Sequence, residues 1–150
     1  MKNIIVVTGG AGFVGSNLIK YLLKKTNLKI ISVDNYSTGS KKNHTNHKNV
    51  KYIKGENINI SNILKKYKNK IKVIFHFGEF SRIYQSFLNT KECINTNIYN
   101  SFEVINFVNE NKIKIIYSAT SSALGNNGNC LLYTSDAADD SLRVDLGGRR

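Results

Sequence analysis

The chain has 150 residues, a length at which a single domain with its own core is common. Its formal charge is +12, but the lysines are spread along the sequence and do not alternate with aromatic residues, which argues against a nucleic-acid reader. Its two cysteines are too few for a disulfide framework, and no apolar stretch has the length of a membrane span or the pattern of a signal peptide. Composition therefore predicts a cytoplasmic protein with neither nucleic acid nor a membrane as a partner.

The composition changes abruptly after Asn129. Residues 1–129 hold all 18 lysines, one arginine and one aspartate, whereas residues 130–150 hold no lysine, asparagine or isoleucine but three arginines and four aspartates. The later segment resembles the conceptual translation of a sequencing adapter, which should be left out of fold reasoning. We expect residues 1–129 to form the folded domain and residues 130–150 to be an artefactual, disordered tail; the alternative is a genuine acidic tail.

The first 34 residues follow the order strand, glycine turn, helix, strand, acid. Ile4–Thr8 is an apolar run, residues 17–25 are amphipathic, and Ile30–Asp34 is a second apolar run. In such a unit the first glycine permits a tight exit from the strand, the second lets a diphosphate approach the backbone, and the third lets the helix pack closely on the strand. The helix start offers unpaired N–H groups and the positive end of a dipole. The turn therefore predicts a dinucleotide site built on Gly9, Gly12 and Gly15.

Asp34 ends the second apolar run, 19 residues after Gly15. A carboxylate at this place can accept hydrogen bonds from both hydroxyls of an adenosine ribose. It would also repel a 2′-phosphate, and no arginine lies between Asp34 and Gly39, so the predicted cofactor is NAD rather than NADP. The alternative is that Asp34 is only a turn residue at the start of a polar loop.

The rest of the chain continues as alternating strands and helices. After a polar loop at 37–49, strands are predicted at 50–54, 71–77 and 113–118, and helices at 60–67 and 92–109. In the longer helix the residues expected to face the core are Ile94, Ile98, Phe102, Ile105 and either Phe107 or Val108. This order predicts an α/β fold of the Rossmann type, a doubly wound parallel sheet with strand order 3-2-1-4-5. The ligand then lies beyond the carboxyl ends of the strands, between the first and fourth strands.

Several segments that follow the predicted strands carry a family resemblance. They are the turn Thr8–Gly15, the pair Asp34–Asn35, and the segments 55–58, 76–79 and 117–125. Together they resemble the extended short-chain dehydrogenase/reductase family, and within it the NAD-dependent epimerases and dehydratases of nucleotide sugars. The resemblance runs from about Lys2 to Asn129. It implies that residues 1–129 are the N-terminal part of an NAD-binding Rossmann domain, truncated before its last strands and its substrate lobe.

The resemblance places cofactor contacts at the ends of these strands, and at Asn97, which begins a segment (97–101) similar to the start of the family's helix before the fifth strand. The backbone of Phe13 and Val14 would contact the diphosphate, and Glu56 and Asn57 would lie near the adenine. Glu79 departs from the family's pattern, so its carboxylate is expected to point away from the cofactor or to be paired. The complete set of expected cofactor-binding residues is Gly9, Gly12, Phe13, Val14, Gly15, Asp34, Asn35, Glu56, Asn57, Phe77, Gly78, Asn97 and Ser118.

The segment from Tyr117 to Gly125 is similar to the strand-end segment that supplies the family's catalytic serine or threonine. This similarity implies that Thr120 is catalytic, with a hydroxyl that hydrogen-bonds the sugar oxygen as it gains or loses a proton. If the resemblance is set aside, the alternative interpretation is that this segment is only a Ser/Thr-rich turn after a strand. The family's Tyr-x-x-x-Lys acid/base pair is absent, because no lysine follows Lys114.

The resemblance implies an enzyme that epimerises a nucleotide sugar with NAD, similar to UDP-glucose 4-epimerase and without a metal. The alternatives are a 4,6-dehydratase or 4-keto reductase of the same family, or a non-catalytic NAD-sensing module. We expect the 150-residue chain itself to bind NAD weakly, to show no turnover and to expose apolar surface where later strands and a second lobe dock. Family members are often dimers, so a homodimer of the full-length protein is compatible with the resemblance.

Overall fold

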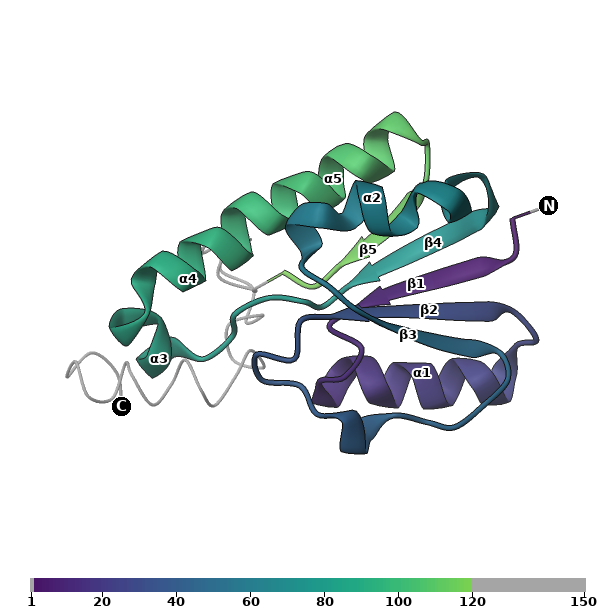
Figure 1. Cartoon of the computed structure of the whole chain (residues 1–150), viewed down its shortest axis with the longest axis horizontal. Coiled ribbons are helices and arrows are strands. Elements are labelled where there is room, and N and C mark those ends of the chain that lie inside the picture. The colour runs from purple at the N-terminus through teal and green to yellow at the C-terminus, as the bar shows by residue number, and fades with distance from the viewer. Residues whose placement is uncertain (1, 120–150) are drawn as a thin grey trace, which may run out of the picture. The chain divides into compact units, whose positions relative to one another are not determined.

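The computed structural model describes residues 2–119 of the chain. Residues up to Tyr117 form one compact unit around a five-stranded sheet with the order β3-β2-β1-β4-β5 (Figure 1). All four pairs of neighbouring strands are parallel. The sheet confirms the predicted Rossmann-type fold and its strand order. The strands are β1 (Ile4–Thr8), β2 (Lys29–Asp34), β3 (Val50–Lys54), β4 (Ile71–His76) and β5 (Lys114–Tyr117).

The central strand β1 is buried on both faces, as expected for a parallel sheet covered by helices. Its residues alternate between two apolar clusters because successive side chains of a strand point to opposite faces. Ile4 and Val6 belong to one cluster, and Ile5 and Val7 belong to the other. The continuous apolar run at the start of the sequence therefore forms the centre of the core.

Helices cover both faces of this sheet (Figure 1). Helix α1 contributes to the cluster that contains Ile5, and helices α2 and α5 contribute to the cluster that contains Ile4. None of the helices in the described part of the chain is long and apolar enough to cross a membrane. The α-helices are α1 (Phe13–Lys25), α2 (Ile60–Leu64), α3 (Ile83–Leu88), α4 (Thr90–Ile94) and α5 (Ser101–Glu110). Shorter helical segments are η1 (Lys41–Asn43), η2 (Asn57–Asn59), η3 (Lys65–Lys70) and the π-helical η4 (Asn95–Asn100).

The helix predicted at residues 92–109 corresponds to α4, η4 and α5, but its predicted core face is largely wrong. Among the residues expected inside, Phe107 and Val108 are buried, whereas four others are 42–59% exposed. A π-helical turn has a wider spacing than an α-helix, so the face that meets the sheet changes along the segment. The residues that α5 buries are Ser101, Val104, Phe107 and Val108. The exposed residues of the predicted face are Ile94, Ile98, Phe102 and Ile105.

Two helix boundaries also differ from the prediction by three residues or more. Helix α1 begins at Phe13 rather than at Asn17, so it already includes Gly15, the last glycine of the turn. Helix α2 ends at Leu64 and continues as the 3₁₀ segment η3 rather than as α-helix to Tyr67. The first difference places the start of α1 within the turn.

Candidate cofactor-binding site

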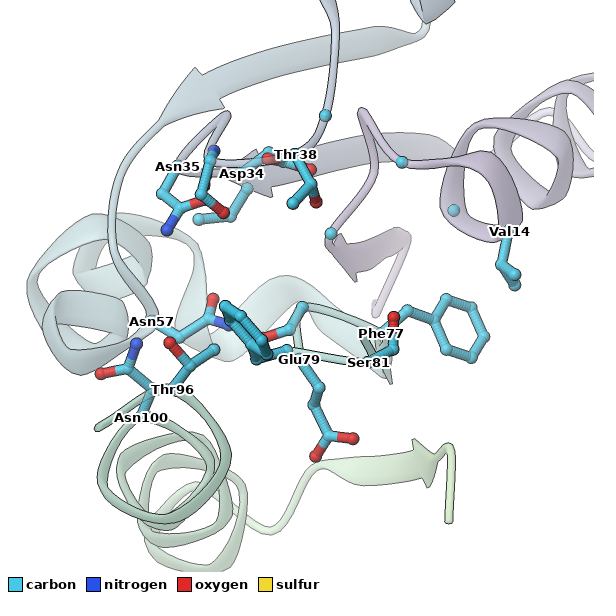
Figure 2. Close-up of a pocket in the computed structure, with 18 of the residues that line it drawn as sticks. Val14, Asp34, Asn35, Thr38, Asn57, Phe77, Glu79, Ser81, Thr96 and Asn100 are labelled. Carbon is cyan, nitrogen blue, oxygen red and sulfur yellow. Dashed lines mark hydrogen bonds between the residues drawn. The ribbon is translucent and has the colours of Figure 1, made fainter. Parts of the chain in front are cut away.

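A pocket of about 420 Å³ lies among loops that follow the strands. Its lining comes from the residues after β1, β2, β3 and β4 and from η4, and Figure 2 shows several of these side chains. In a doubly wound sheet, the loops at the carboxyl ends diverge at the point where the strand order reverses, here between β1 and β4. The pocket therefore lies where the sequence predicted a ligand.

Two glycines of the turn are required by the packing of the backbone. Gly9 has a φ of 69°, in the left-handed region, and a Cβ there would lie 2.6 Å from the carbonyl oxygen of Phe77. A Cβ at Gly15 would overlap the carbonyl oxygen of Gly9. A Cβ at Gly12 would meet a single protein atom within 4 Å, that same oxygen at 3.3 Å. Gly12 thus leaves room at the pocket wall, as an approaching diphosphate requires.

The amino end of α1 borders this pocket. Gly12 is its N-cap residue and has no side chain to cap the first N–H groups, and the first turn contains no acidic residue. Phe13 and Val14 line the pocket and are 83% and 58% exposed. The unpaired N–H groups at a helix start attract anions, so this end of α1 suits a phosphate group.

The Asp34 carboxylate lies at the end of β2 and is 8% exposed. Its Oδ2 accepts a hydrogen bond from the backbone N–H of Ala11 (2.8 Å), and its Oδ1 accepts one from the backbone N–H of Tyr36 (2.8 Å). An ionised carboxylate has about four lone-pair sites, so two bonds do not saturate it. Asp34 therefore orders the glycine turn and can still accept hydrogen bonds from a ligand.

The loop after Asp34 folds over the glycine turn. The carbonyl oxygen of Ala11 accepts hydrogen bonds from the Asn43 side-chain amide (2.7 Å) and from the Ser40 backbone N–H (3.1 Å). Both polar groups of the Ala11 peptide are thus used within the protein. The first intrahelical hydrogen bond runs from the Ser16 N–H to the Gly12 carbonyl oxygen (3.1 Å), so the N–H groups of Phe13, Val14 and Gly15 are the ones left at the helix start.

Two side-chain amides join the loops that follow β2, β3 and β4. Asn35 donates to the Glu56 carboxylate (3.2 Å), and Asn57 donates to the carbonyl oxygen of Gly78 (3.2 Å). A Cβ at Gly78 would lie 2.6 Å from the Asn57 amide nitrogen, so this contact requires glycine. These residues, together with Phe77, line the pocket beside the glycine turn and Asp34.

Glu79 is paired, which is one of the two arrangements that the sequence predicted. Its Oε1 accepts hydrogen bonds from the Tyr117 hydroxyl (2.5 Å) and from the Ser101 hydroxyl (3.3 Å). The hydrogen bond to Glu79 raises the pKa of Tyr117 to about 12, and burial and the charge of Glu79 act in the same direction. The Tyr117 phenol therefore stays protonated at neutral pH and acts as a donor, not as a base.

A buried chain of side chains beneath the pocket was not predicted from the sequence. His76 is fully buried, and burial lowers its pKa to about 4, so its imidazole is neutral at pH 7. Its Nδ1 lies 2.6 Å from the Thr8 hydroxyl, and its Nε2 lies 3.0 Å from the Ser101 hydroxyl. Thr8 ends β1 and Ser101 begins α5, so the histidine connects three elements at the carboxyl edge of the sheet. No local pattern could reveal this connection, because Thr8 and Ser101 lie far from His76 in the sequence.

Three expected site residues lie elsewhere or outside the described residues. The Asn97 amide accepts a hydrogen bond from the Phe80 N–H (2.7 Å) and donates one to the Phe80 carbonyl oxygen (2.9 Å), so it holds the loop after β4 and is not part of the pocket lining. Ser118 follows β5 and is exposed. Thr120, the expected catalytic residue, lies outside the described residues.

The pocket contains polar residues that the sequence did not single out individually. Six of them lie in segments that follow predicted strands, and that position was the available signal for them. The other two, Thr96 and Asn100, belong to the predicted helix before β5. Within residues 2–119 no group of histidine, cysteine, aspartate and glutamate side chains could hold a metal ion. The additional polar lining residues are Ser37, Thr38, Asn43, Ser81, Arg82, Gln85, Thr96 and Asn100.

Known proteins resemble this chain in sequence and in structure. ADP-L-glycero-D-manno-heptose-6-epimerase from Brachyspira hyodysenteriae is 32% identical over 130 residues, which are 84% of this chain and 40% of that protein. UDP-N-acetylglucosamine 4-epimerase from Methanobrevibacter ruminantium, solved with UDP-N-acetylmuramic acid, is 28% identical with a TM-score of 0.74, covering 98% of this chain and 50% of that one. UDP-glucose 4-epimerase from Bifidobacterium longum, solved with NAD⁺ and UDP, is 26% identical with a TM-score of 0.69, covering 81% of this chain and 38% of that one.

The chain spans 33–49% of the length of three curated relatives that it matches. The model of the NAD dependent epimerase/dehydratase family matches residues 5–142, most of the chain. With its strand order and glycine turn, the chain belongs to the NAD dependent epimerase/dehydratase family.

Proposed function

We propose that this chain is the cofactor-binding part of an enzyme that epimerises a nucleotide sugar with NAD, similar to UDP-glucose 4-epimerase. The observation that supports the proposal is one pocket that joins an uncapped helix start, a glycine turn that is open at Gly12, and the buried Asp34 carboxylate. These groups match the phosphates and the ribose hydroxyls of a dinucleotide.

Each half of the dinucleotide has a set of proposed partners. Asp34 would accept the adenosine ribose hydroxyls, with Asn35, Glu56 and Asn57 around the adenine end. Gly9 and Gly15 would shape the turn, Gly12 would leave room for the diphosphate, and the N–H groups of Phe13 and Val14 would bind it. The nicotinamide half would lie toward Phe77 and Gly78, which follow β4. We also propose cofactor contact for Ser118, whereas the hydrogen bonds of Asn97 support a role through the Phe80 loop.

The chemistry divides between the cofactor and the chain. NAD⁺ supplies a hydride acceptor for the sugar C4 and a source from which hydride returns to the opposite face. We propose that the Thr120 hydroxyl hydrogen-bonds the sugar oxygen that gains or loses a proton. The acid/base partner would come from a longer protein, because no lysine follows Lys114 to complete a Tyr-x-x-x-Lys pair.

NAD is proposed over NADP for two reasons. The Asp34 carboxylate would repel a 2′-phosphate. The loop after it is also packed tightly, since a Cβ at Gly39 would lie 2.9 Å from Ala11 Cβ and 3.1 Å from Asp34 Oδ1. A titration in which NADPH binds more tightly than NADH would contradict this assignment.

A 4,6-dehydratase or 4-keto reductase is the second candidate. The family model covers epimerases and dehydratases alike, and they share the cofactor half that this chain supplies. Incubation of the full-length protein with NAD⁺ and UDP-glucose or UDP-galactose separates the candidates. Interconversion of the two sugars supports the epimerase, a 4-keto product supports the dehydratase, and unchanged UDP-glucose, UDP-galactose and acid derivatives contradict the epimerase assignment.

We propose further that residues 130–150 derive from an adapter and that the protein acts in the cytoplasm, as a homodimer when full length. Long, adapter-free reads across the Asn129–Cys130 junction test the first part. A frame that continues into a Tyr-x-x-x-Lys motif supports the enzyme. A frame that encodes Cys130–Arg150 contradicts it and favours an NAD-sensing module. For the 150-residue chain itself we expect weak NAD binding and no turnover.

A further inference from the structure

Glu79 places a carboxylate at the opposite end of the pocket from Asp34. Both residues line the pocket, and Figure 2 shows the Glu79 carboxylate on the far side from Asp34, Asn35 and Thr38. Asp34 is the last residue of β2, whereas Glu79 follows β4, on the other side of β1 in the sheet. If the adenosine ribose is held at Asp34, the nicotinamide half extends toward the loop that contains Glu79.

The position of the Glu79 carboxylate is determined by a closed ring of contacts. Tyr117 and Ser101 both donate to its Oε1. The Tyr117 ring packs on the His76 ring, with centroids 5.6 Å apart and planes inclined by 26°, and His76 in turn contacts the Ser101 hydroxyl. Residues from β4, β5 and α5 therefore hold one carboxylate oxygen in place.

The direction of these hydrogen bonds follows from their donors. The Thr8 hydroxyl oxygen accepts from the N–H groups of Phe77 and Gly78 (3.2 Å each), so its own hydrogen is available for His76 Nδ1. The neutral imidazole must then carry its proton on Nε2 and donate to Ser101. The Ser101 hydrogen is left for Glu79. The chain of donors thus ends on the carboxylate, which as an ionised group only accepts.

We propose that Glu79 is a specificity-determining residue that favours the oxidised, cationic form of the nicotinamide cofactor over the reduced, neutral form. The inference rests on the proposed function, because it requires a nicotinamide dinucleotide in this pocket. NAD⁺ and NADH differ by one positive charge on the nicotinamide ring and share the same adenosine and diphosphate. A fixed negative charge near that ring therefore strengthens the binding of NAD⁺ relative to NADH.

The other charged groups of the pocket do not cancel this preference. Asp34 and Glu56 line the pocket where we propose the adenosine half, so their distances to the ring would be longer. Arg82 lies in the same loop as Glu79 but is exposed, where solvent screens its charge more strongly. Arg82 is also present in every Glu79 variant, so its contribution to the preference for NAD⁺ is the same in the proteins compared.

The test compares the dissociation constants of NAD⁺ and NADH for the 150-residue chain and its Glu79→Gln variant. Titration followed by protein NMR suits the weak binding that we expect. Removal of the charge should lower the preference for NAD⁺ about tenfold. Two unit charges several ångströms apart in a partly solvated site interact with an energy of this size. For a two-electron couple, tenfold corresponds to a shift of about 30 mV in the potential of the bound cofactor.

Three further variants control the measurement. Glu79→Ala also removes the charge and should lower the preference for NAD⁺ to the same extent. It takes the place of Glu79→Gln if that variant does not fold. Glu79→Asp retains the charge and should keep the preference for NAD⁺. Glu56→Gln removes a carboxylate at the adenosine end, so it should change both affinities alike and leave their ratio unchanged.

The outcomes separate this inference from the proposed function. Suppose that NAD⁺ and NADH both bind, and that the ratio of their dissociation constants is the same in the wild type and in the neutral Glu79 variants. The inference is then wrong, while the proposed cofactor stands. A parallel loss of both affinities also overturns it, because Glu79 would then only maintain the pocket. If the wild-type chain binds neither form, the proposed function fails and this inference fails with it.

Discussion

The two ends of the pocket hold their carboxylates in different ways. Asp34 is held by two backbone N–H groups, from the glycine turn and from the residue two positions further on. Glu79 is held by two side-chain hydroxyls, from Ser101 on α5 and Tyr117 on β5. Backbone donors are present whatever the residue type, whereas hydroxyl donors depend on two particular side chains. The Asp34 end is therefore a property of the Rossmann turn, and the Glu79 end is a property of this chain.

The largest expected effect is at the Asp34 end. Asp34→Ala removes the acceptor of two charge-assisted hydrogen bonds and leaves the buried N–H of Ala11 without its partner. We expect the free energy of unfolding to fall by about 4 kcal/mol, measured by urea denaturation at pH 7. Ser37→Ala in the same loop is the control and should have little effect. A loss as small as that of the control would show that Asp34 does not order the turn.

The buried His76 beneath the Glu79 end should make stability depend on pH. Because burial lowers its pKa from 6.5 to about 4, the unfolded chain binds a proton between these values and the folded chain does not. The contribution is fully present above pH 6.5, is lost as pH falls toward 4, and amounts to about 3 kcal/mol at 1.36 kcal/mol per pKa unit.

Urea denaturation of the wild type and His76→Asn between pH 7 and 4 measures this contribution. The variant should lose less stability over that range than the wild type does. His47→Asn removes an exposed histidine and should keep the wild-type slope. Equal slopes in the wild type and His76→Asn would contradict the neutral, buried imidazole.

The helix that supports the Glu79 end provides a paired test of its core face. Val104 on α5 is fully buried, whereas Phe102 is 57% exposed. Val104→Ala should reduce the free energy of unfolding by about 2 kcal/mol because it leaves a cavity. Phe102→Gln should change it by less than about 0.5 kcal/mol. If Phe102→Gln were the more destabilising of the two changes, the core face that the sequence predicted would be correct.

The smallest expected effect is that of Tyr117→Phe, which removes one donor to Glu79. Tyr117 is 44% exposed, so water can replace part of the lost interaction. We expect a loss of about 1 kcal/mol, and a double-mutant cycle with Glu79→Gln should show that the two losses are not additive. Additive losses would mean that the two side chains act independently and would weaken the comparison between the two ends.

The core face of α4–η4–α5 shows the limit of sequence periodicity. Apolar residues lie on more than one side of this helical segment, so a spacing of three or four residues fits two different faces. The π-helical turn at Asn95–Asn100 and the burial of Ser101 beside His76 select between them. That selection depends on contacts with distant strands, and it leaves Ile98 and Phe102 exposed.

The sequence by itself determined the sheet order, the glycine turn and the place of Asp34. These features follow from local rules, since Gly9 needs a left-handed φ, Gly15 needs close packing, and parallel strands align their carboxyl ends. Only the tertiary structure decided how Glu79 is paired. Its partners Ser101 and Tyr117 lie 22 and 38 residues away, and no local preference encodes a contact that forms only when α5 and β5 pack beside β4.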